Sequence, residues 1–291
     1  MRIAIDAGHG SNTPGKRTPP LKRDVDIDGD GQVDIRAGEQ YREHYASVGV
    51  CAMLDGALRR CGFETLKVSW DDADGKNDAN MPLAARQAMI RAAGCRICVS
   101  VHFNAWGDGT VFNSASGVCT YIHSNRASVG ESRELAERIQ RNLAGGTAQR
   151  NRGVKEAGFA MCSCPATGTR AAILCELAFM TNEYEASLMT NADFWAEAAE
   201  EICRGICEYT GAEYREEEEM SYNKFLEYME RYRAELADKP AAEWGQESDE
   251  AIKWAEDSGI IRGDEQGRKQ YQAPLTRQAY ILMEYRRKSA D

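Results

Sequence analysis

The sequence predicts an α/β fold: a mostly parallel, twisted sheet flanked by helices on both faces, followed by a small all-α C-terminal domain. Short apolar, β-branched runs alternate with longer segments of helical periodicity up to about residue 211, which is typical of parallel sheets. The composition then becomes acidic, and amphipathic helical patterns follow. We therefore expect a first domain over residues 1–211, an acidic linker over 212–221 and a helical domain over 222–291.

The predicted strands are short and end at small or polar residues, as buried parallel strands do. They cover residues 2–6, 63–70, 96–103, 117–123, 158–163 and 171–177. Two of these runs lead into His9 and His102, at the strand ends where open α/β sheets bind ligands. The chain has only 4 histidines, so two of them at this edge indicate a shared metal ion.

The predicted helices carry apolar residues at intervals of three and four. They cover residues 41–61, 82–93, 131–144 and 192–209 in the first domain, and 221–237, 248–258 and 276–287 in the C-terminal domain. The first helix presents Val48, Cys51 and Leu54 on one face and stops at Gly62, which is a suitable C-terminal residue. The C-terminal domain is small for an independent core, which favours self-association as a homo-oligomer.

Charge and hydropathy exclude several classes of protein. The 291-residue chain has a net charge of -10, which argues against nucleic acid as a partner because phosphate binding needs a basic surface. No apolar run approaches the roughly 18 residues that a membrane span needs. A strand follows Met1 and Arg2 without the apolar core of a signal peptide, so we expect synthesis in the cytoplasm without an export signal.

Ten cysteines are spread through the first domain. Most lie inside apolar runs, so we interpret them as reduced core thiols of a protein made in a cytosol. The pairs Cys95 with Cys98 and Cys162 with Cys164 have spacings that resemble half of a structural zinc site. Cys95 and Cys98 would lie on opposite faces of a strand, however, which disfavours a thiolate site.

His9 and His102 supply two ligands of a hydrolytic metal site, which needs about three protein ligands and an open position for water. The third ligand is expected after the first strand. Glu43 is the best candidate, because it begins the long helix whose far end leads into the second strand. His44 competes with it, and Glu39 is a weaker candidate.

One carboxylate interrupts the strongly apolar run over residues 172–177, and it is Glu176. A buried charge is costly unless it is paired or functional. We therefore expect Glu176 to be the general base beside the metal ion.

Six blocks of sequence, in order, carry a family resemblance. They are Ile5-Asp6-Ala7-Gly8-His9-Gly10, Glu43 before a helix ending at Gly62, Leu83-x-x-Arg86, Ser100-Val101-His102-Phe103-Asn104-Ala105, Asn151-Arg152-Gly153-Val154-Lys155 and Cys175-Glu176-Leu177-Ala178-Phe179-Met180-Thr181-Asn182. Through these blocks, residues 1–210 resemble the zinc-dependent N-acetylmuramoyl-L-alanine amidases. The resemblance implies zinc bound by His9, Glu43 and His102, with Glu176 as the catalytic carboxylate. It also implies a peptidoglycan hydrolase that cleaves the amide between N-acetylmuramic acid and L-alanine.

Three further residues are candidates for substrate contact. Asn104 and Asn182 could orient the substrate or the metal ligands, although strand-ending and turn-forming roles suit asparagine equally well. Arg86 is either a substrate contact or part of an ion pair on the helix surface. Two other functions fit the pattern: a wall-binding protein without catalysis, and a metallopeptidase that cuts bonds within the stem peptide. The presence of all four expected site residues disfavours the first.

An aspartate-rich insertion separates His9 from Glu43. Asp26, Asp28, Asp30 and Asp34, with a glycine at the sharp turn, match the start of a calcium-binding loop. Ala37 stands where that loop has its bidentate glutamate, and Glu39 could substitute from outside the frame. A solvated β-hairpin with Asp-Gly turns is the alternative. Calcium is slightly favoured, because so many neighbouring carboxylates repel one another without a cation.

The segment Trp254 to Asp264, followed by Pro274 to Gln278, resembles one surface-layer-homology repeat. Such repeats bind cell-wall polymers, usually as three copies per assembly, so a single repeat again favours oligomerisation. A generic helical hairpin is the alternative.

A wall hydrolase without an export signal is best explained as a phage or prophage endolysin, which waits in the host cytoplasm for holin-type release. Met220 directly follows Glu216 to Glu219, and codons for consecutive glutamates can contain a ribosome-binding sequence. We therefore expect an internal start at Met220, which would release a separate fragment over 220–291 that joins full-length chains and raises avidity for the wall.

Overall fold

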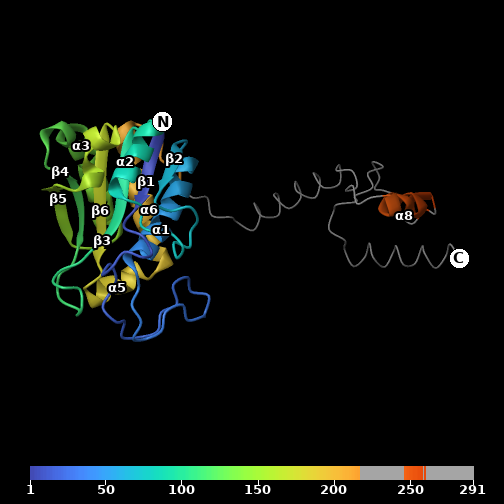
Figure 1. Cartoon of the computed structure of the whole chain (residues 1–291), viewed down its shortest axis with the longest axis horizontal. Helices are drawn as coiled ribbons and strands as arrows, with labels where there is room; N and C mark the ends of the chain where they lie inside the picture. The colour runs from blue at the N-terminus through green and yellow to red at the C-terminus, as the bar shows by residue number, and fades with distance from the viewer. Residues whose placement is uncertain (217–245, 258, 260–291) are drawn as a thin grey trace. The chain divides into compact units, whose positions relative to one another are not determined.

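The computed structural model describes residues 1–216, 246–257 and 259. The chain divides into two compact units, Met1–Glu217 and Glu218–Asp291. The first unit contains the sheet (Figure 1). Its strands are β1 (Arg2–Ala7), β2 (Glu64–Val68), β3 (Ile97–Asn104), β4 (Val118–His123), β5 (Asn151–Ala157) and β6 (Ala171–Phe179).

The sheet has the strand order β2-β1-β3-β6-β4-β5. The first four strands in this order run parallel to one another. β4 is antiparallel to β6, and β5 is parallel to β4, so the last two strands run in the opposite direction. The prediction of a mostly parallel sheet is confirmed. Of the parallel strands, β1, β3 and β6 are buried and are nearly continuous apolar runs, as expected for strands covered on both faces, whereas β2 at the edge is partly exposed.

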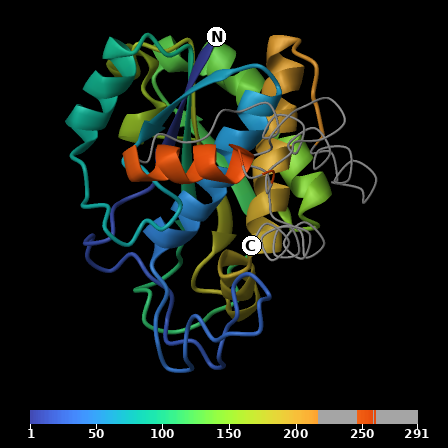
Figure 2. The ribbon, with the colours of Figure 1, turned by 90° about the vertical axis from the view of Figure 1, so that its right-hand side faces the viewer.

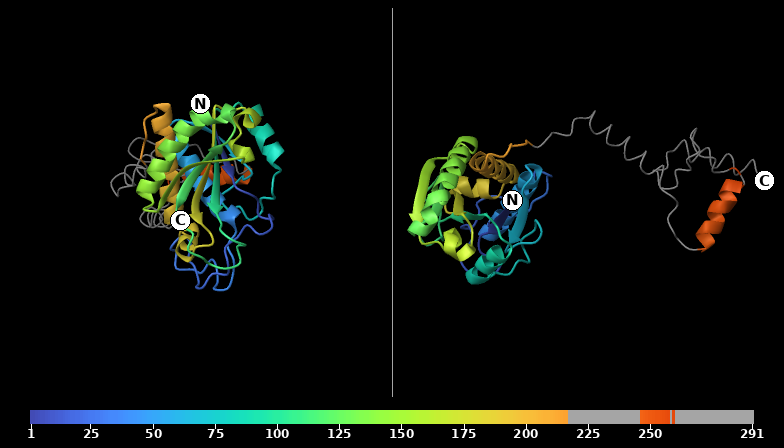
Figure 3. Two further views of the ribbon diagram at one scale, coloured as in Figure 1. Left: turned by 90° about the vertical axis from the view of Figure 1, so that its left-hand side faces the viewer. Right: turned by 90° about the horizontal axis from the view of Figure 1, so that it is seen from above.

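Helices cover both faces of the sheet, as the sequence predicts (Figures 2 and 3). The helices of the first unit are α1 (Glu43–Arg60), α2 (Leu83–Ala92), α3 (Arg126–Gly146), α4 (Cys164–Thr167), α5 (Glu183–Met189) and α6 (Ala192–Thr210). α1 and α3 pack on one face, and α6 packs against both of them. α2 covers the other face with α4 and the short 3-10 helix η1 (Ala160–Cys162).

The predicted strand over residues 158–163 is wrong. The strand is β5, which lies just before it and has a polar, partly exposed sequence because it is at the edge of the sheet. Met161 and Cys162, which follow Gly158, lie in η1 and are buried instead. The helices α4 and α5 were not predicted from the sequence. α3 begins at Arg126, earlier than predicted, because the Asn125 side chain accepts a hydrogen bond from Ala127 N and caps the helix.

The carboxyl ends of the parallel strands meet at one end of the sheet. Figure 1 shows α5 and the long loop between β1 and α1 at this end, away from the N-terminus. The segments that follow β1, β3 and β6 all emerge here. This end of the sheet therefore collects the residues that the sequence analysis selected as candidate ligands.

In the second unit, the structure describes α8 (Gln246–Asp257), which confirms the predicted helix over 248–258 with slightly earlier bounds. The helices predicted over 221–237 and 276–287, and Met220, lie outside the described residues. Within the described part of the chain, we find no helix with the length and apolar character needed to cross a membrane. The first residues of the predicted linker belong to the first unit, because the Tyr214 hydroxyl donates a hydrogen bond to Glu200 of α6 at 2.6 Å.

Candidate metal centre and catalytic pocket

Three potential metal ligands converge at the carboxyl edge of the sheet. One ligand atom from each of His9, Glu43 and His102 lies within 4.8 Å of the other two. The Glu43 carboxylate lies between the two rings, with Oε1 2.9 Å from His102 Nδ1 and Oε2 3.3 Å from His9 Nε2. Two imidazole nitrogens and one carboxylate oxygen are a ligand set of open, hydrolytic zinc sites. The residues present therefore fit zinc.

The backbone holds the two imidazoles close together. His9 adopts a left-handed conformation with φ of 63°, which is uncommon for a residue other than glycine. Gly8 lets the loop approach His102, since a Cβ at Gly8 would lie 2.6 Å from atoms of the His102 ring. The His9 carbonyl accepts hydrogen bonds from Arg86 Nη2 and from Ser69 Oγ. The loop after β1 is thus fixed in a strained conformation that directs His9 toward Glu43.

A buried chain of hydrogen bonds connects the two histidines from behind. Ser100 Oγ lies 3.1 Å from His102 Nε2 and donates to Asp6 Oδ2 at 2.5 Å. Asp6 Oδ1 pairs with Arg86 Nη1 at 3.0 Å, and the same guanidinium donates to the His9 carbonyl. A carboxylate behind a ligating histidine fixes the ring orientation and its tautomer. Here Asp6 does so through Ser100.

The three side chains shift one another's pKa values. Burial raises the pKa of Glu43, but hydrogen bonds from His102 and His9 outweigh burial and lower this pKa to about 2. Burial disfavours the charged imidazolium of His102, yet the hydrogen bond and charge of Glu43 outweigh burial and raise the pKa of His102. Glu43 is therefore a buried, ionised carboxylate that requires positive charge beside it, which either a protonated histidine or a metal cation supplies.

Glu176 lies next to His102, because the two residues pair in the parallel register of β6 and β3. Its Oε2 atom is buried and, within the described structure, has no hydrogen-bond partner. Burial and the nearby Glu43 carboxylate raise the pKa of Glu176 to about 8, while His102 and Lys16 oppose the rise. A carboxylate whose pKa is near neutral is well matched to general acid–base catalysis.

These residues line a pocket of about 370 Å³. Lys16, Leu83 and Phe159 also line it, and none of them was predicted as a contact, although Leu83 stands in one of the six resemblance blocks. Lys16 lies in the insertion, and its carbonyl accepts a hydrogen bond from Glu43 N, which places it beside the ligand. Leu83 and Phe159 are exposed apolar residues at 52% and 38%, a signal that only the three-dimensional structure connects to the site.

The competing ligands lie outside the cluster. His44 is buried, with Nδ1 2.8 Å from the Gly8 carbonyl and Nε2 3.3 Å from Asp78, so it supports the loop after β1. The Glu39 carboxylate accepts a hydrogen bond from Arg36 N in the insertion. The structure therefore brings Glu43, and neither of these two residues, between the histidines.

The three residues selected for substrate contact have different positions. Asn104 lines the pocket. Asn182 caps α5, since its side chain accepts a hydrogen bond from Glu185 N, so its position supports the structural alternative. Arg86 is buried, at 1% exposure, and all the hydrogen bonds described above for its guanidinium are internal. The interpretation of Arg86 as part of an ion pair on the helix surface is wrong, because its partner Asp6 is in the core. Arg86 also does not line the pocket, since it lies behind the metal centre.

The aspartate-rich insertion contains a second group of converging carboxylates. Asp26, Asp28 and Asp34 each place an oxygen atom within 4.8 Å of the other two. Asp30 is not in this group, and its carboxylate accepts hydrogen bonds from the backbone and side chain of Gln32. An antiparallel bridge between residues 25 and 35 closes the loop like a hairpin. Calcium binding by this loop stays a prediction.

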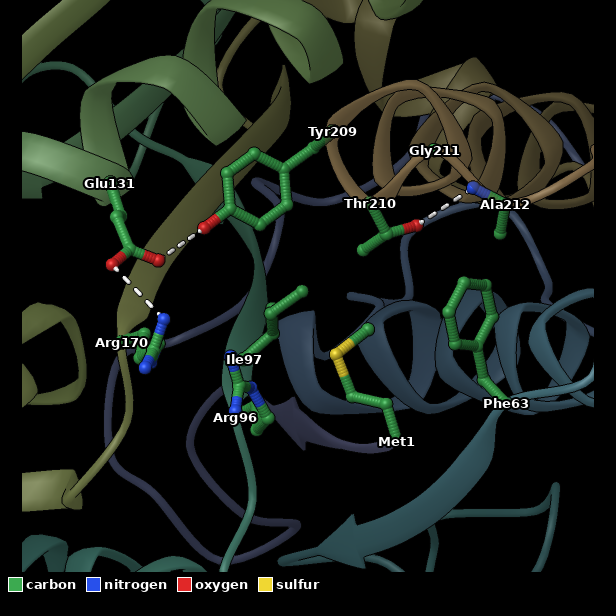
Figure 4. A pocket seen from close by; sticks show the side chains of 10 residues that line it. All are labelled: Met1, Phe63, Arg96, Ile97, Glu131, Arg170, Tyr209, Thr210, Gly211 and Ala212. Atoms are coloured by element: carbon green, nitrogen blue, oxygen red, sulfur yellow. Dashed lines mark hydrogen bonds and ion pairs between the residues drawn. The ribbon is translucent and has the colours of Figure 1, made fainter.

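A cavity of about 470 Å³, larger than the catalytic pocket, lies at the other end of the sheet (Figure 4). Figure 4 shows that the Tyr209 hydroxyl donates a hydrogen bond to the Glu131 carboxylate, and that Arg170 forms an ion pair with the same carboxylate. The lining includes Arg96 but neither histidine nor cysteine. The volume of a cavity therefore does not identify the active site here. The smaller pocket, where the potential metal ligands converge, is the candidate active site.

The chain matches the family model described as Amidase_3, N-acetylmuramoyl-L-alanine amidase, over residues 3–208. The chain belongs to this family. Two proteins of Bacillus subtilis (strain 168) are similar to it. The uncharacterized protein YqiI is 34% identical over 138 residues, which cover 47% of this chain and 62% of that protein. The N-acetylmuramoyl-L-alanine amidase LytC is 32% identical over 133 residues, which cover 46% and 25%. The chain thus spans less than two thirds of the length of these relatives.

Solved amidase structures share the fold. An N-acetylmuramoyl-L-alanine amidase from Clostridium difficile 630 superposes with a TM-score of 0.56 at 22% identity, covering 72% of this chain and 97% of that one. The catalytic domain of the amidase CwlV from Bacillus (Paenibacillus) polymyxa var. colistinus gives a TM-score of 0.54 at 20% identity, covering 73% and 99%. Both similarities confirm the predicted α/β fold of the first unit.

Proposed function

We propose that this protein is a zinc-dependent peptidoglycan hydrolase, which cleaves the amide between the lactyl group of N-acetylmuramic acid and L-alanine. The observation that carries the proposal is the buried, unpartnered Glu176 Oε2 atom beside the His9, Glu43 and His102 cluster. A buried acceptor without a partner is costly, so a fold keeps one where a ligand or reactant uses it. Membership of the amidase family and the pocket support the same conclusion.

Each residue has a role in hydrolysis. His9, Glu43 and His102 would hold zinc, which when bound acidifies water and polarises a carbonyl group. Glu176 accepts the proton of the attacking water as general base and then donates it to the leaving nitrogen of L-alanine. Burial raises its pKa above that of an ordinary carboxyl group, which suits a group that first accepts a proton and then returns it.

The pocket fits a substrate that is part sugar and part peptide. Leu83 and Phe159 provide apolar surface at the rim, and Phe159 is held edge-on against Tyr121 with 5.0 Å between ring centroids. Lys16 places positive charge beside the same pocket, which suits the carboxylates of a stem peptide. Asn104 offers an amide at the end of β3 for hydrogen bonding to the substrate.

Digestion of purified cell walls tests this proposal. We expect the wild-type chain to release intact stem peptides free of sugar, with new L-alanine N-termini, while Glu176→Gln releases them far more slowly. Peptide fragments cut between amino acids would instead identify a metallopeptidase. Wall binding by the wild type without any released fragment would identify a protein without catalysis. Mass spectrometry of the soluble products distinguishes the three results.

We also propose that the enzyme is a phage or prophage endolysin, made in the host cytoplasm and released by a holin. The second unit would bind wall polymers through its single surface-layer-homology-like segment and form homo-oligomers, joined by a 220–291 fragment from an internal start. Light scattering of the untagged protein tests oligomerisation. A short second band that Met220→Leu removes would support the internal start, and an unchanged band pattern would contradict it.

A further inference from the structure

Three buried thiols converge where α1 and α6 end, in a part of the first unit that the proposed function does not use. Cys61 is the C-cap of α1, while Cys203 and Cys207 lie one turn apart on α6. Their Sγ atoms all lie within 4.8 Å of one another, and Cys203 Sγ is 3.7 Å from Cys61 Sγ. The sequence signal was the spacing of four residues on a helix, which places both α6 thiols on one face.

The separation of these sulfur atoms is compatible with metal coordination. Zinc–thiolate bonds are about 2.3 Å long, so two thiolates on one tetrahedral ion lie roughly 3.8 Å apart. The Cys61 to Cys203 separation of 3.7 Å is close to this value before any ion is present. Among the described residues, these are the cysteines whose ligand atoms form such a group of three.

Polar groups of α6 and of the segment that follows it lie beside the cluster. The Arg215 backbone N–H points at Cys61 Sγ, with the two heavy atoms 3.3 Å apart. Arg204, which lies between Cys203 and Cys207 in the sequence, stacks on the Tyr214 ring, with 4.1 Å between its Cζ atom and the ring centroid. The Arg215 N–H and the Arg204 guanidinium would compensate part of the negative charge that several thiolates share.

Cysteines elsewhere in the first unit are in a different environment. Burial raises the pKa of Cys51 and of Cys98 well above the ordinary value, and nearby acidic groups raise both further. Thiols of this kind remain protonated and act as small apolar side chains. The reduced core thiols predicted from the sequence therefore describe these residues well, whereas Cys61, Cys203 and Cys207 differ in that their sulfur atoms lie within 4.8 Å of one another.

We propose that Cys61, Cys203 and Cys207 form a second metal site, which binds a thiophilic d10 cation such as Zn²⁺ and is separate from the catalytic centre. The ion would connect the ends of α1 and α6. It would also hold the segment of residues 212–215, whose Glu213 carbonyl lies 3.9 Å from Cys207 Sγ. Such a site contributes to folding because the unfolded chain has no preformed cluster.

Metal content of the full-length chain, purified with a phosphine reductant, tests the proposal. We expect two zinc equivalents in the wild type, and one in both Cys203→Ala and His102→Ala, because each of these variants loses a different site. Cd²⁺ distinguishes the sites spectroscopically, since only thiolates give the sulfur-to-metal charge-transfer absorption. That absorption is expected in the wild type and in His102→Ala, and it should be lost in Cys203→Ala.

The matched control is Cys51→Ala, which removes a buried thiol of α1 outside the cluster and should keep the charge-transfer absorption. Cys61→Ala, at the end of α1, is the second cluster variant if Cys203→Ala does not fold. A wild-type protein without this absorption would overturn the proposal. An absorption that both cluster variants retain at wild-type strength would also overturn it, because other thiols would then be the ligands.

Discussion

Glu176 in β6 and Glu185 in α5 both have carboxylate oxygens out of contact with solvent, and their surroundings differ. Glu176 faces the pocket with one carboxylate oxygen unpartnered among the described residues. Glu185 accepts hydrogen bonds from Phe179 N and Gly117 N, each at 2.6 Å, with one carboxylate oxygen for each donor. The comparison shows that hydrogen-bond satisfaction, more than burial, separates a carboxylate available for chemistry from one that holds the fold together.

The largest expected effect is that of Glu176→Gln on catalysis. Glutamine has nearly the same shape but cannot accept and return a proton, and general acid–base catalysis contributes about 10²–10⁴-fold to the rate. We therefore expect the rate of stem-peptide release from purified walls to fall by about that factor. Zinc content should stay at the wild-type level, because Glu176 is outside the ligand group. Loss of zinc in this variant would make Glu176 a ligand and contradict its role as a base.

The same variant tests the cost of burying Glu176. Its pKa of about 8 in the fold lies above the ordinary value of 4.5, so protonation favours the folded state. The contribution of this group to stability is thus largest below about pH 4.5 and is lost as the pH rises toward 8. Without metal, Glu176→Gln should melt at the same temperature as the wild type or higher at pH 9. A lower melting temperature there would mean that the charge is paired.

The buried carboxylate of Asp6 extends the comparison. It is paired with Arg86, and it is also connected to His102 of the metal centre through Ser100. Ser100→Ala breaks its link to His102 while leaving the ion pair of Asp6 with Arg86 in place. Loss of such a supporting contact weakens metal affinity by about 10–100-fold. Competition with a zinc chelator measures the change. Ser47→Ala is the matched control, because Ser47 is equally buried but its hydroxyl has no partner within the described structure.

The metal centre shows what the sequence could predict. His9 and His102 each follow an apolar run, and the carboxyl ends of parallel strands meet, so their proximity was predictable from topology. Glu43 and His44 are adjacent in the sequence, so their side chains leave the first turn of α1 in different directions. The sequence alone does not show which of these directions points to the edge of the sheet. Arg86 was misplaced because its partner Asp6 is 80 residues away, and only the fold brings the two together.

Glu185→Gln should act on stability instead of catalysis. The amide has one oxygen, so one of the two buried N–H donors that now bind the carboxylate loses its acceptor, at a cost of about 1–3 kcal/mol. Chemical denaturation measures this loss, and the rate per folded molecule should be unchanged. Glu183→Gln on the same helix is the control, because Glu183 is exposed and its ion pair with Lys22 contributes little. A Glu185 variant of full stability but reduced rate would instead make α5 part of the active site.

The elements that were not predicted from the sequence are those stabilised by contacts with other parts of the fold, rather than by an apolar pattern of their own. α5 is 7 residues long and depends on its Asn182 cap and on Glu185, so it has no periodic apolar face of its own. β5 is an edge strand with polar side chains, and the strand pattern was assigned to the more apolar residues that follow it. Long, buried segments such as β3 were placed within one residue, because burial on both faces leaves a continuous apolar run.

The smallest expected effect concerns the exposed carboxylates of the insertion. Asp26 accepts hydrogen bonds from Gly29 N and Gly31 N, both at 2.8 Å, so the loop is already formed by its own backbone. If it binds calcium, added Ca²⁺ at about ten times the dissociation constant should stabilise the zinc-loaded protein by only about 1.4 kcal/mol. Asp28→Asn should remove this increment and leave the hydrolysis rate unchanged. Asp72→Asn is the control, since Asp72 also accepts a backbone hydrogen bond in an exposed loop but lies outside the cluster. A calcium-independent melting temperature in the wild type would favour the hairpin alternative, in which hydrogen bonds alone satisfy these carboxylates, as they do for Glu185.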